Sequence, residues 1–163
     1  RYHKKNSGSP QGNNIMTISK PQLKHLIWEQ LSIVVGEKNK DFKCPPATQD
    51  INLNLENRQK AIEEQNYGPP DPSKPNEKFW KAKMEMWNVD SEEDLKGMIC
   101  GTCAAFNLKK EMQDCIAQGI GEEPGDDPWA TIEAGDIGYC QFLKFKCAAK
   151  RTCDAWVSGG PIK

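Results

Sequence analysis

The sequence predicts a small, irregular α+β domain with few secondary structures, preceded by an extended and partly helical N-terminal region. Three observations lead to this fold class. Six of the seven cysteines lie in residues 100–153, and four prolines fall within the eight residues 68–75. Apolar residues make up only 37% of the chain, which is little for one large core. We therefore expect an N-terminal region over residues 1–76 and a cysteine-rich domain over residues 77–163.

The N-terminal region is predicted to contain an arm and one amphipathic helix. Residues 1–17 are polar and rich in Gly, Ser and Asn, which is typical of a flexible arm. Apolar residues recur at helical spacing over 19–35, where Ser19 can cap the helix and Gly36 can end it. The apolar stripe of this helix packs either against the chain's own core or against a neighbouring subunit.

Between this helix and the cysteine-rich domain, the sequence predicts mostly irregular chain. Residues 37–50 read as a polar loop, and residues 55–66 as a short, mostly polar helix. The proline-rich stretch 68–75 cannot sustain a helix or a central strand, so we expect a linker there.

The cysteine-rich domain is predicted to combine short helices with turns. Helices are expected over 77–87, from Ser91 (a capping residue) up to Cys100, and from Phe106 to about residue 118. Residues 119–138 are rich in Gly, Pro and Asp and hold Trp129, so we expect a loop.

Charge and motif content exclude several classes of function. The net charge is −1, so no overall field attracts nucleic acid or an anionic membrane. No apolar run approaches the roughly 18 residues that span a bilayer. With two histidines, no glycine-rich phosphate loop and no nucleophile elbow, the sequence indicates a protein that is not an enzyme.

Four cysteines have a spacing that suits a 4Fe–4S cluster. Cys100 and Cys103 form a C-x2-C pair, Cys140 follows after thirty-six residues, and Cys153 after twelve more. A C-x2-C turn places two thiolates on one concave loop, and two further thiolates complete the shell that such a cluster requires. Three aromatic residues follow these cysteines by two or three positions and are expected to shield the cluster from water: Phe106, Phe142 and Trp156.

Other states of these cysteines remain open from the residues alone. Structural zinc also accepts four thiolates, although its usual signature has two close pairs. Disulfides and reduced core thiols are further alternatives. The basic start of the chain, residues 1–5, lacks the apolar stretch of a secretion signal, which favours metal binding over a disulfide framework.

The other three cysteines have weaker assignments. Cys115 and Cys147 are expected to be a structural pair or buried thiols, with one of them replacing Cys140 as the alternative. Cys44 is most simply an unpaired thiol in a loop.

The pattern of C-x2-C, Cys140-Gln-Phe142 and Cys153-x-x-Trp156 resembles that of the high-potential iron–sulfur proteins. The resemblance covers about residues 98–157 and implies that Cys100, Cys103, Cys140 and Cys153 bind a 4Fe–4S cluster. The stretch between the second and third ligands is much longer here than is usual in that family. Cys115 and Cys147 have no counterpart there.

A second resemblance concerns the biological setting. The segment from Ile18 to Leu31 is similar to structural proteins of large marine tailed phages, and the ending from Cys153 to Ile162 is similar to small phage proteins of unassigned role. Together these resemblances imply a cluster-binding structural protein of the virion, with the cluster as a staple. Its partners would be other protein subunits, contacted through the N-terminal arm and helix. The alternatives are a one-electron carrier or a structural zinc protein, and a cytoplasmic location.

Overall fold

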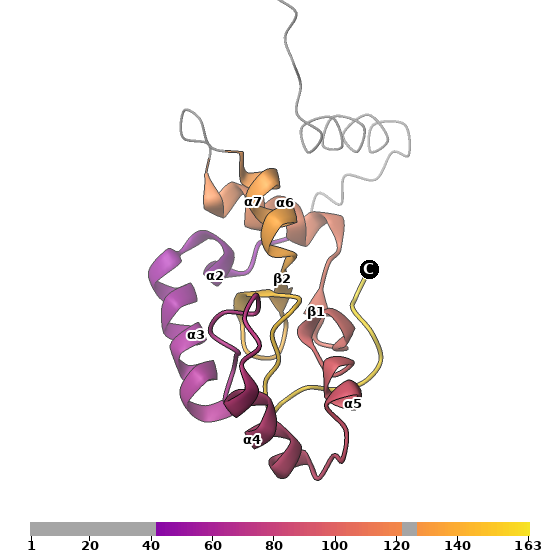
Figure 1. Cartoon of the computed structure of the whole chain (residues 1–163). Helices are drawn as coiled ribbons and strands as arrows, with labels where there is room; N and C mark the ends of the chain where they lie inside the picture. The colour runs from indigo at the N-terminus through magenta and orange to yellow at the C-terminus, as the bar shows by residue number, and fades with distance from the viewer. Residues whose placement is uncertain (1–41, 122–126) are drawn as a thin grey trace, which may run out of the picture.

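The computed structural model describes residues 42–121 and 127–163, which form a mixed α+β fold (Figure 1). The expected arm over 1–17 and helix over 19–35 lie outside these residues. The described helices are α2 (Pro46–Gln49), α3 (Ile51–Gln65), α4 (Glu77–Trp87), α5 (Glu92–Lys96), the 3-10 helix η1 (Cys100–Thr102), α6 (Lys110–Ile120) and α7 (Pro128–Gly135). The strands β1 (Phe106–Asn107), β2 (Ile137–Cys140) and β3 (Phe145–Ala148) form one antiparallel sheet in the order β1-β2-β3.

The sheet separates two small cores. Successive residues of a strand point to opposite faces, so Tyr139 and Cys140 of β2 serve different cores. Tyr139 packs with α6 and α7, around Met112 and Ile116. Cys140 faces the other side, where it packs against a core of buried cysteines and aromatic residues that includes Phe145. In Figure 1, α3 flanks the sheet, α6 and α7 lie at one end, and α4 and α5 lie at the other.

Capping residues explain where several helices begin. The Asp50 side chain accepts hydrogen bonds from the N–H groups of Asn52 and Leu53, which fixes the start of α3. Ser91 accepts from the Glu93 N–H and caps α5 as the sequence predicts. The predicted helix over 77–87 is confirmed as α4. The helix expected after Phe106 is found as α6, which begins only at Lys110 because Phe106 and Asn107 form β1, and the helix expected to run from Ser91 to Cys100 ends at Lys96. The helix expected over 55–66 begins earlier, as α3.

The predicted loop over 119–138 is wrong in its second half. Asp127 caps a helix there by accepting from the N–H groups of Trp129 and Ala130, and Pro128 occupies the first helical position. The resulting helix, α7, packs against α6 and β2. A proline after a capping aspartate starts a helix rather than a loop, and this signal was present in the sequence.

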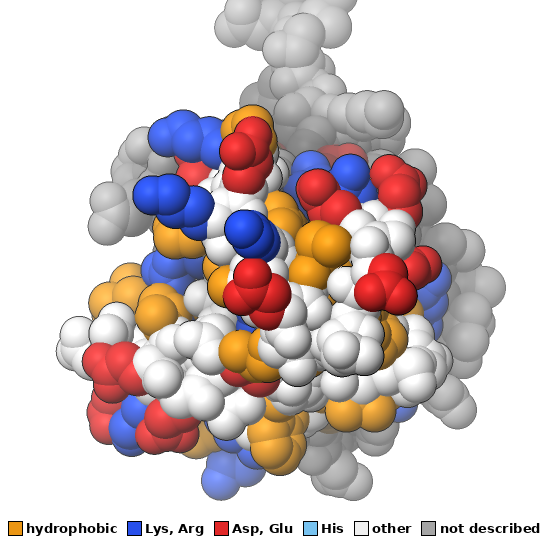
Figure 2. All heavy atoms as spheres, turned by 60° about the horizontal axis from the view of Figure 1, so that its bottom comes forward, with side chains coloured by type: hydrophobic (Ala, Val, Ile, Leu, Met, Phe, Trp, Pro, Cys, Tyr) orange, Lys and Arg blue, Asp and Glu red, His pale blue; other side chains and the backbone are white. Residues whose placement is uncertain are grey.

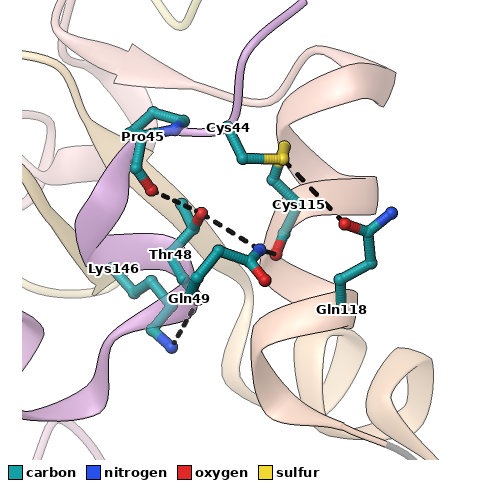
Figure 3. Close-up of a disulfide and its surroundings, with 7 residues drawn as sticks. All are labelled: Cys44, Pro45, Thr48, Gln49, Cys115, Gln118 and Lys146. Carbon is teal, nitrogen blue, oxygen red and sulfur yellow. Dashed lines mark hydrogen bonds between the residues drawn. A yellow bond between two sulfur atoms is a disulfide. The ribbon is translucent and has the colours of Figure 1, made fainter.

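Contacts cross the domain boundary expected at residue 76. Helix α2 packs on α6, and α3 packs along β3. A disulfide joins Cys44 to Cys115 on α6, and the Gln49 side chain donates a hydrogen bond to the Cys115 carbonyl oxygen at 2.7 Å (Figure 3). The expectation of an unpaired Cys44 is therefore wrong, because folding brings together two residues that lie 71 positions apart. Cys115 and Cys147 do not pair with each other, and Cys147 is a buried free thiol, which was the other expectation for it.

The proline-rich linker is held against the end of the chain. Gly68 and Thr152 exchange two backbone hydrogen bonds, of 3.0 and 2.7 Å between nitrogen and oxygen. The Arg151 side chain donates to the Pro70 carbonyl oxygen at 2.9 Å. These contacts place the linker directly beside Cys153. In the described part of the chain, no helix is both long and apolar enough to span a bilayer.

The contact between α2 and α6 generates a test. A Cβ atom added at Gly119 would lie well inside van der Waals contact with the Thr48 carbonyl oxygen. Replacing a helical glycine by alanine ordinarily stabilises a helix by about 1 kcal/mol. We expect Gly119→Ala to do the opposite and lower the free energy of unfolding by roughly 1–3 kcal/mol, because α2 must move away.

Chemical denaturation measures this change, and Gly97→Ala is the matched control. A Cβ atom at Gly97 would meet only the Asp94 carbonyl oxygen, at 3.4 Å. If both variants were as stable as the wild type, the close packing of α2 on α6 would be contradicted.

Candidate functional site

Five free cysteine thiols meet at one cavity. The cavity is small and partly open to solvent. Apart from the sulfur atoms, its lining is apolar. The residues that line it are Cys100, Cys103, Ala105, Phe106, Cys140, Phe142, Leu143, Cys147, Cys153, Ala155 and Trp156. All four predicted ligands and all three predicted aromatic residues are therefore placed around the same space, together with Cys147.

The first two cysteines lie at the ends of the 3-10 turn η1. Backbone hydrogen bonds hold this turn against the C-terminal segment: the Cys100 N–H donates to the Arg151 carbonyl oxygen at 2.6 Å, and the Gly101 N–H donates to the Ala149 carbonyl oxygen at 2.9 Å. The tight turn places both sulfur atoms on its inner side. The C-x2-C pair consequently faces the strands and turns that carry the other cysteines.

The third and fourth predicted ligands also lie at turns. Cys140 is the last residue of β2, and the chain turns back from it into β3 through Lys144, whose φ of 57° is in the left-handed region. Cys153 follows Thr152, which is paired with Gly68. Cys140 is thus at the end of a strand, and Cys153 directly follows an isolated bridge pair.

Backbone N–H groups point at the sulfur atoms in these turns. The Ala105 N–H donates to Cys103 Sγ at 3.5 Å, and the Leu143 N–H donates to Cys140 Sγ at 3.3 Å. The Ala155 N–H makes the same kind of hydrogen bond to Cys153. An N–H donor stabilises a thiolate, and hydrogen bonds to the sulfur atoms tune iron–sulfur clusters. The turns are therefore suited to hold negatively charged sulfur.

Cys147 differs from the other four cysteines in its setting. It lies within β3, opposite Gly138 in the ladder, and is 3% exposed. Its thiol is hydrogen-bonded to Cys100. No backbone N–H bond to the Cys147 sulfur is found among the described residues. Cys147 therefore has the setting of a buried core residue, whereas the other four cysteines lie at turns or strand ends.

Burial and mutual contact shift the thiol pKa values. Burial raises the pKa of Cys140, and raises that of Cys153 to about 12. In the Cys100–Cys147 pair the hydrogen bond raises the pKa of Cys147 well above its ordinary value and lowers that of Cys100. Without a metal, most of this site therefore consists of protonated thiols. Metal ions would have to displace these protons.

The three aromatic residues lie at different depths. Phe106 is 2% exposed and forms part of the inner wall. Trp156 is half-buried, and its indole N–H donates to the Ile99 carbonyl oxygen at 3.0 Å. Phe142 is 65% exposed while still lining the cavity. Phe142 therefore forms the rim of the mouth rather than an inner wall.

Tyr67 is a site residue that sequence reasoning missed. Its ring packs edge-on against Phe145, with 4.9 Å between ring centroids, and its hydroxyl accepts from the Ala148 N–H at 3.4 Å. Burial, together with the nearby sulfur atoms of Cys147 and Cys100, raises the pKa of this phenol. In the sequence Tyr67 lies between a polar helix and the linker, where nothing indicates burial.

The distance between thiolates differs between a site for one zinc ion and a site for a 4Fe–4S cluster. Two thiolates bound to one zinc ion lie about 3.8 Å apart, given zinc–sulfur distances of about 2.3 Å and tetrahedral geometry. Among residues 42–121 and 127–163, no group of three or more Cys, His, Asp or Glu side chains is arranged to hold a single metal ion. A 4Fe–4S cube holds its thiolates farther apart, one on each of four irons. Thiols in an apolar cavity are the kind of donor that such a cluster takes.

Fold and site together define a small α+β protein with a buried cluster of thiols. Comparison with known proteins adds no family: no family model matches the chain, and no similar curated protein or solved structure was found.

The burial of the thiols generates a second test. In the metal-free protein at pH 8 we expect Cys140, Cys147 and Cys153 to react slowly with an alkylating reagent, because each has a raised pKa and because Cys147 and Cys153 are also buried. Cys100, whose pKa is lowered, should react faster than Cys147. Mass spectrometry of timed samples measures the order of labelling.

Protein unfolded in guanidinium is the control, because all the free thiols should then react alike. Rapid labelling of Cys147 in the folded protein would contradict the closed site described here.

Proposed function

We propose that this protein binds a 4Fe–4S cluster through Cys100, Cys103, Cys140 and Cys153, as its resemblance to high-potential iron–sulfur proteins implies. The observation that carries the proposal is the arrangement of these four cysteines. All four lie at turns or strand ends around one apolar cavity, and N–H groups point at the sulfur atoms of three of them. When bound, such a cluster supplies four iron–thiolate bonds and a one-electron couple.

The setting of Cys147 supports Cys140 as the third ligand. A cluster needs each thiolate on a separate iron, so two sulfur atoms in hydrogen-bonding contact cannot both be ligands without moving apart. Cys147 is in such contact with Cys100, and its strand has no turn in which an N–H group could support its sulfur. Cys140 lies at the strand end, with the Leu143 N–H directed at it.

A structural role of the cluster is supported by how little else holds the site together. The four proposed ligands come from η1, from the chain after it, from the end of β2 and from the C-terminal segment. The strands contain only two to four residues each. Iron–thiolate bonds would join these segments and contribute folding free energy, as structural metals do.

We propose that the protein serves an assembly rather than catalysing a reaction, with a tailed-phage virion as its setting. One feature of the described chain supports contact with other subunits. Three exposed apolar residues of α3 lie along one face of the helix: Ile51, Leu55 and Ile62 are 64%, 50% and 38% exposed. An exposed apolar stripe of this kind is typical of a surface that meets another protein.

Electron transfer is the second candidate function, and one observation favours it. Phe142 is both a cavity residue and 65% exposed, so the cavity reaches the surface at this side chain. A carrier needs a short path between cluster and solvent. In this role Phe142 would lie between the cluster and an electron partner.

Anaerobic reconstitution with iron and sulfide tests the cluster itself. We expect about four irons and four sulfides per chain, with broad visible absorption from thiolate-to-iron charge transfer. Replacing any of the four proposed ligands by alanine should remove most of the bound iron. Cys147→Ala is the matched control, since it removes a buried thiol from the same cavity, and should retain the cluster.

Two results would contradict this assignment. If Cys147→Ala lost the iron and Cys140→Ala kept it, Cys147 rather than Cys140 would be the third ligand. If the protein were colourless and contained one zinc ion per chain, the site would be a structural zinc site and not a cluster site.

Removal of the metal distinguishes the two roles of the cluster. If the cluster is a staple that contributes several kcal/mol, chelation should lower the Tm by roughly 10 °C or more, or abolish the cooperative transition altogether. Calorimetry before and after chelation measures this. A Tm that hardly changes, together with a reversible couple in voltammetry, would favour the electron carrier instead.

A further inference from the structure

Lys83 is a buried cation next to the proposed cluster site. It lies on α4, is 2% exposed, and forms an ion pair with Asp154. Asp154 directly follows the proposed ligand Cys153. A lysine is almost never buried to this extent unless it is paired, because removing its charge from water costs much free energy. The pair is therefore a specific feature that needs an explanation.

Asp154 is held from a second side by the end of α3. Its N–H donates to the Gln65 carbonyl oxygen at 2.8 Å, and its carboxylate accepts from the Asn66 side-chain amide at 2.6 Å. With the Lys83 ion pair, two helices converge on the residue after Cys153. The direction of the Cys153 turn is consequently fixed by groups that do not touch the sulfur atom.

Two aromatic rings enclose the Lys83 ammonium group. Its nitrogen lies 5.5 Å from the centroid of Phe79 and 5.2 Å from that of Trp87. These residues are four positions before and four after Lys83, so all three share one face of α4. A Cβ atom added at Gly68 would lie 2.8 Å from the Phe79 ring, which shows that this face packs closely onto the linker.

The outer surface of this region differs from the environment of Lys83. On the face that carries α4 and α5, separate hydrophobic patches lie among acidic and basic side chains (Figure 2). Lys78 and Lys81 of α4 are exposed in this solvated surface, whereas Lys83 is buried. The same helix therefore offers matched lysines with and without a buried partner.

We propose that the Lys83–Asp154 pair is a positioning device for the cluster, which orients the Cys153 ligand and sets the local electrostatic field. This role rests on the proposed cluster binding. Partners beyond the first ligand shell fix ligand orientation, and their loss typically weakens metal binding by about 10–100-fold. Charges near an iron–sulfur cluster also shift its reduction potential, since added positive charge favours the reduced state.

The two single substitutions have opposite electrostatic consequences. Lys83→Met leaves the Asp154 carboxylate unbalanced beside the cluster and should lower the reduction potential. Asp154→Asn leaves the Lys83 ammonium unbalanced and should raise it. Both remove the ion pair, so both should speed the loss of the cluster to a chelator by about tenfold. A purely structural ion pair would give similar losses without the opposite shifts in potential.

The experiment compares four reconstituted full-length proteins: wild type, Lys83→Met, Asp154→Asn and Lys81→Met. Redox titration followed by visible absorption gives the potentials, and the decay of that absorption under chelator gives the rates of cluster loss. We expect Lys81→Met to match the wild type in both. If Lys83→Met does not fold, the isosteric Asp154→Asn, at a side chain that is 20% exposed, carries the test alone.

The outcomes separate this role from cluster binding. A wild-type cluster with unchanged potentials and loss rates in both pair variants would overturn the role of the Lys83–Asp154 pair alone. A wild-type protein that takes up no iron would overturn the proposed cluster and this role together.

Discussion

The rest of the structure depends on the meeting of five thiols in one apolar cavity. These side chains come from segments spread over more than fifty residues, and each segment must arrive at the cavity through a tight turn. The strands that connect them are too short to form a stable sheet alone, with two to four residues each. Burial raises the pKa values of Cys140 and Cys153, and the hydrogen bond to Cys100 together with burial raises that of Cys147. A bound cluster would join the segments that carry these cysteines through iron–thiolate bonds.

The helices around the site are fastened largely by polar contacts. The buried residues of α3 are Asn54 and Ala61, and the Asn54 side chain accepts from the Lys146 N–H at 2.8 Å. The buried residue of α4 is Lys83, which pairs with Asp154. Such contacts are directional, so they fix the position of a helix more narrowly than an apolar face does. They also leave the apolar stripe of α3 exposed.

Local signals predicted those parts of the fold in which neighbouring residues decide the conformation. The limits of α4 agree with the prediction because its apolar residues, its linker and the following asparagine all lie close in sequence. The capping role of Ser91 was predicted for the same reason. Helix α7 was missed although Asp127 and Pro128 carry a start signal, because the glycine- and aspartate-rich composition around them favoured a loop. The disulfide could not be predicted, since two of seven cysteines at a separation of 71 residues have no local signal for pairing.

The sequence by itself determined the pattern of cysteines and aromatic residues that suggests a candidate site. The C-x2-C pair, the two later cysteines and their trailing aromatic residues define a pattern of spacing, and spacing is a local property of the chain. Only the tertiary structure decided that Tyr67 also lies beside these thiols, that Cys147 is fully enclosed within β3, that Phe142 lies at the mouth, and that Lys83 is buried. These facts depend on how β3, α3 and α4 pack against one another. Packing brings together residues that are distant along the chain, and no spacing within the sequence encodes it.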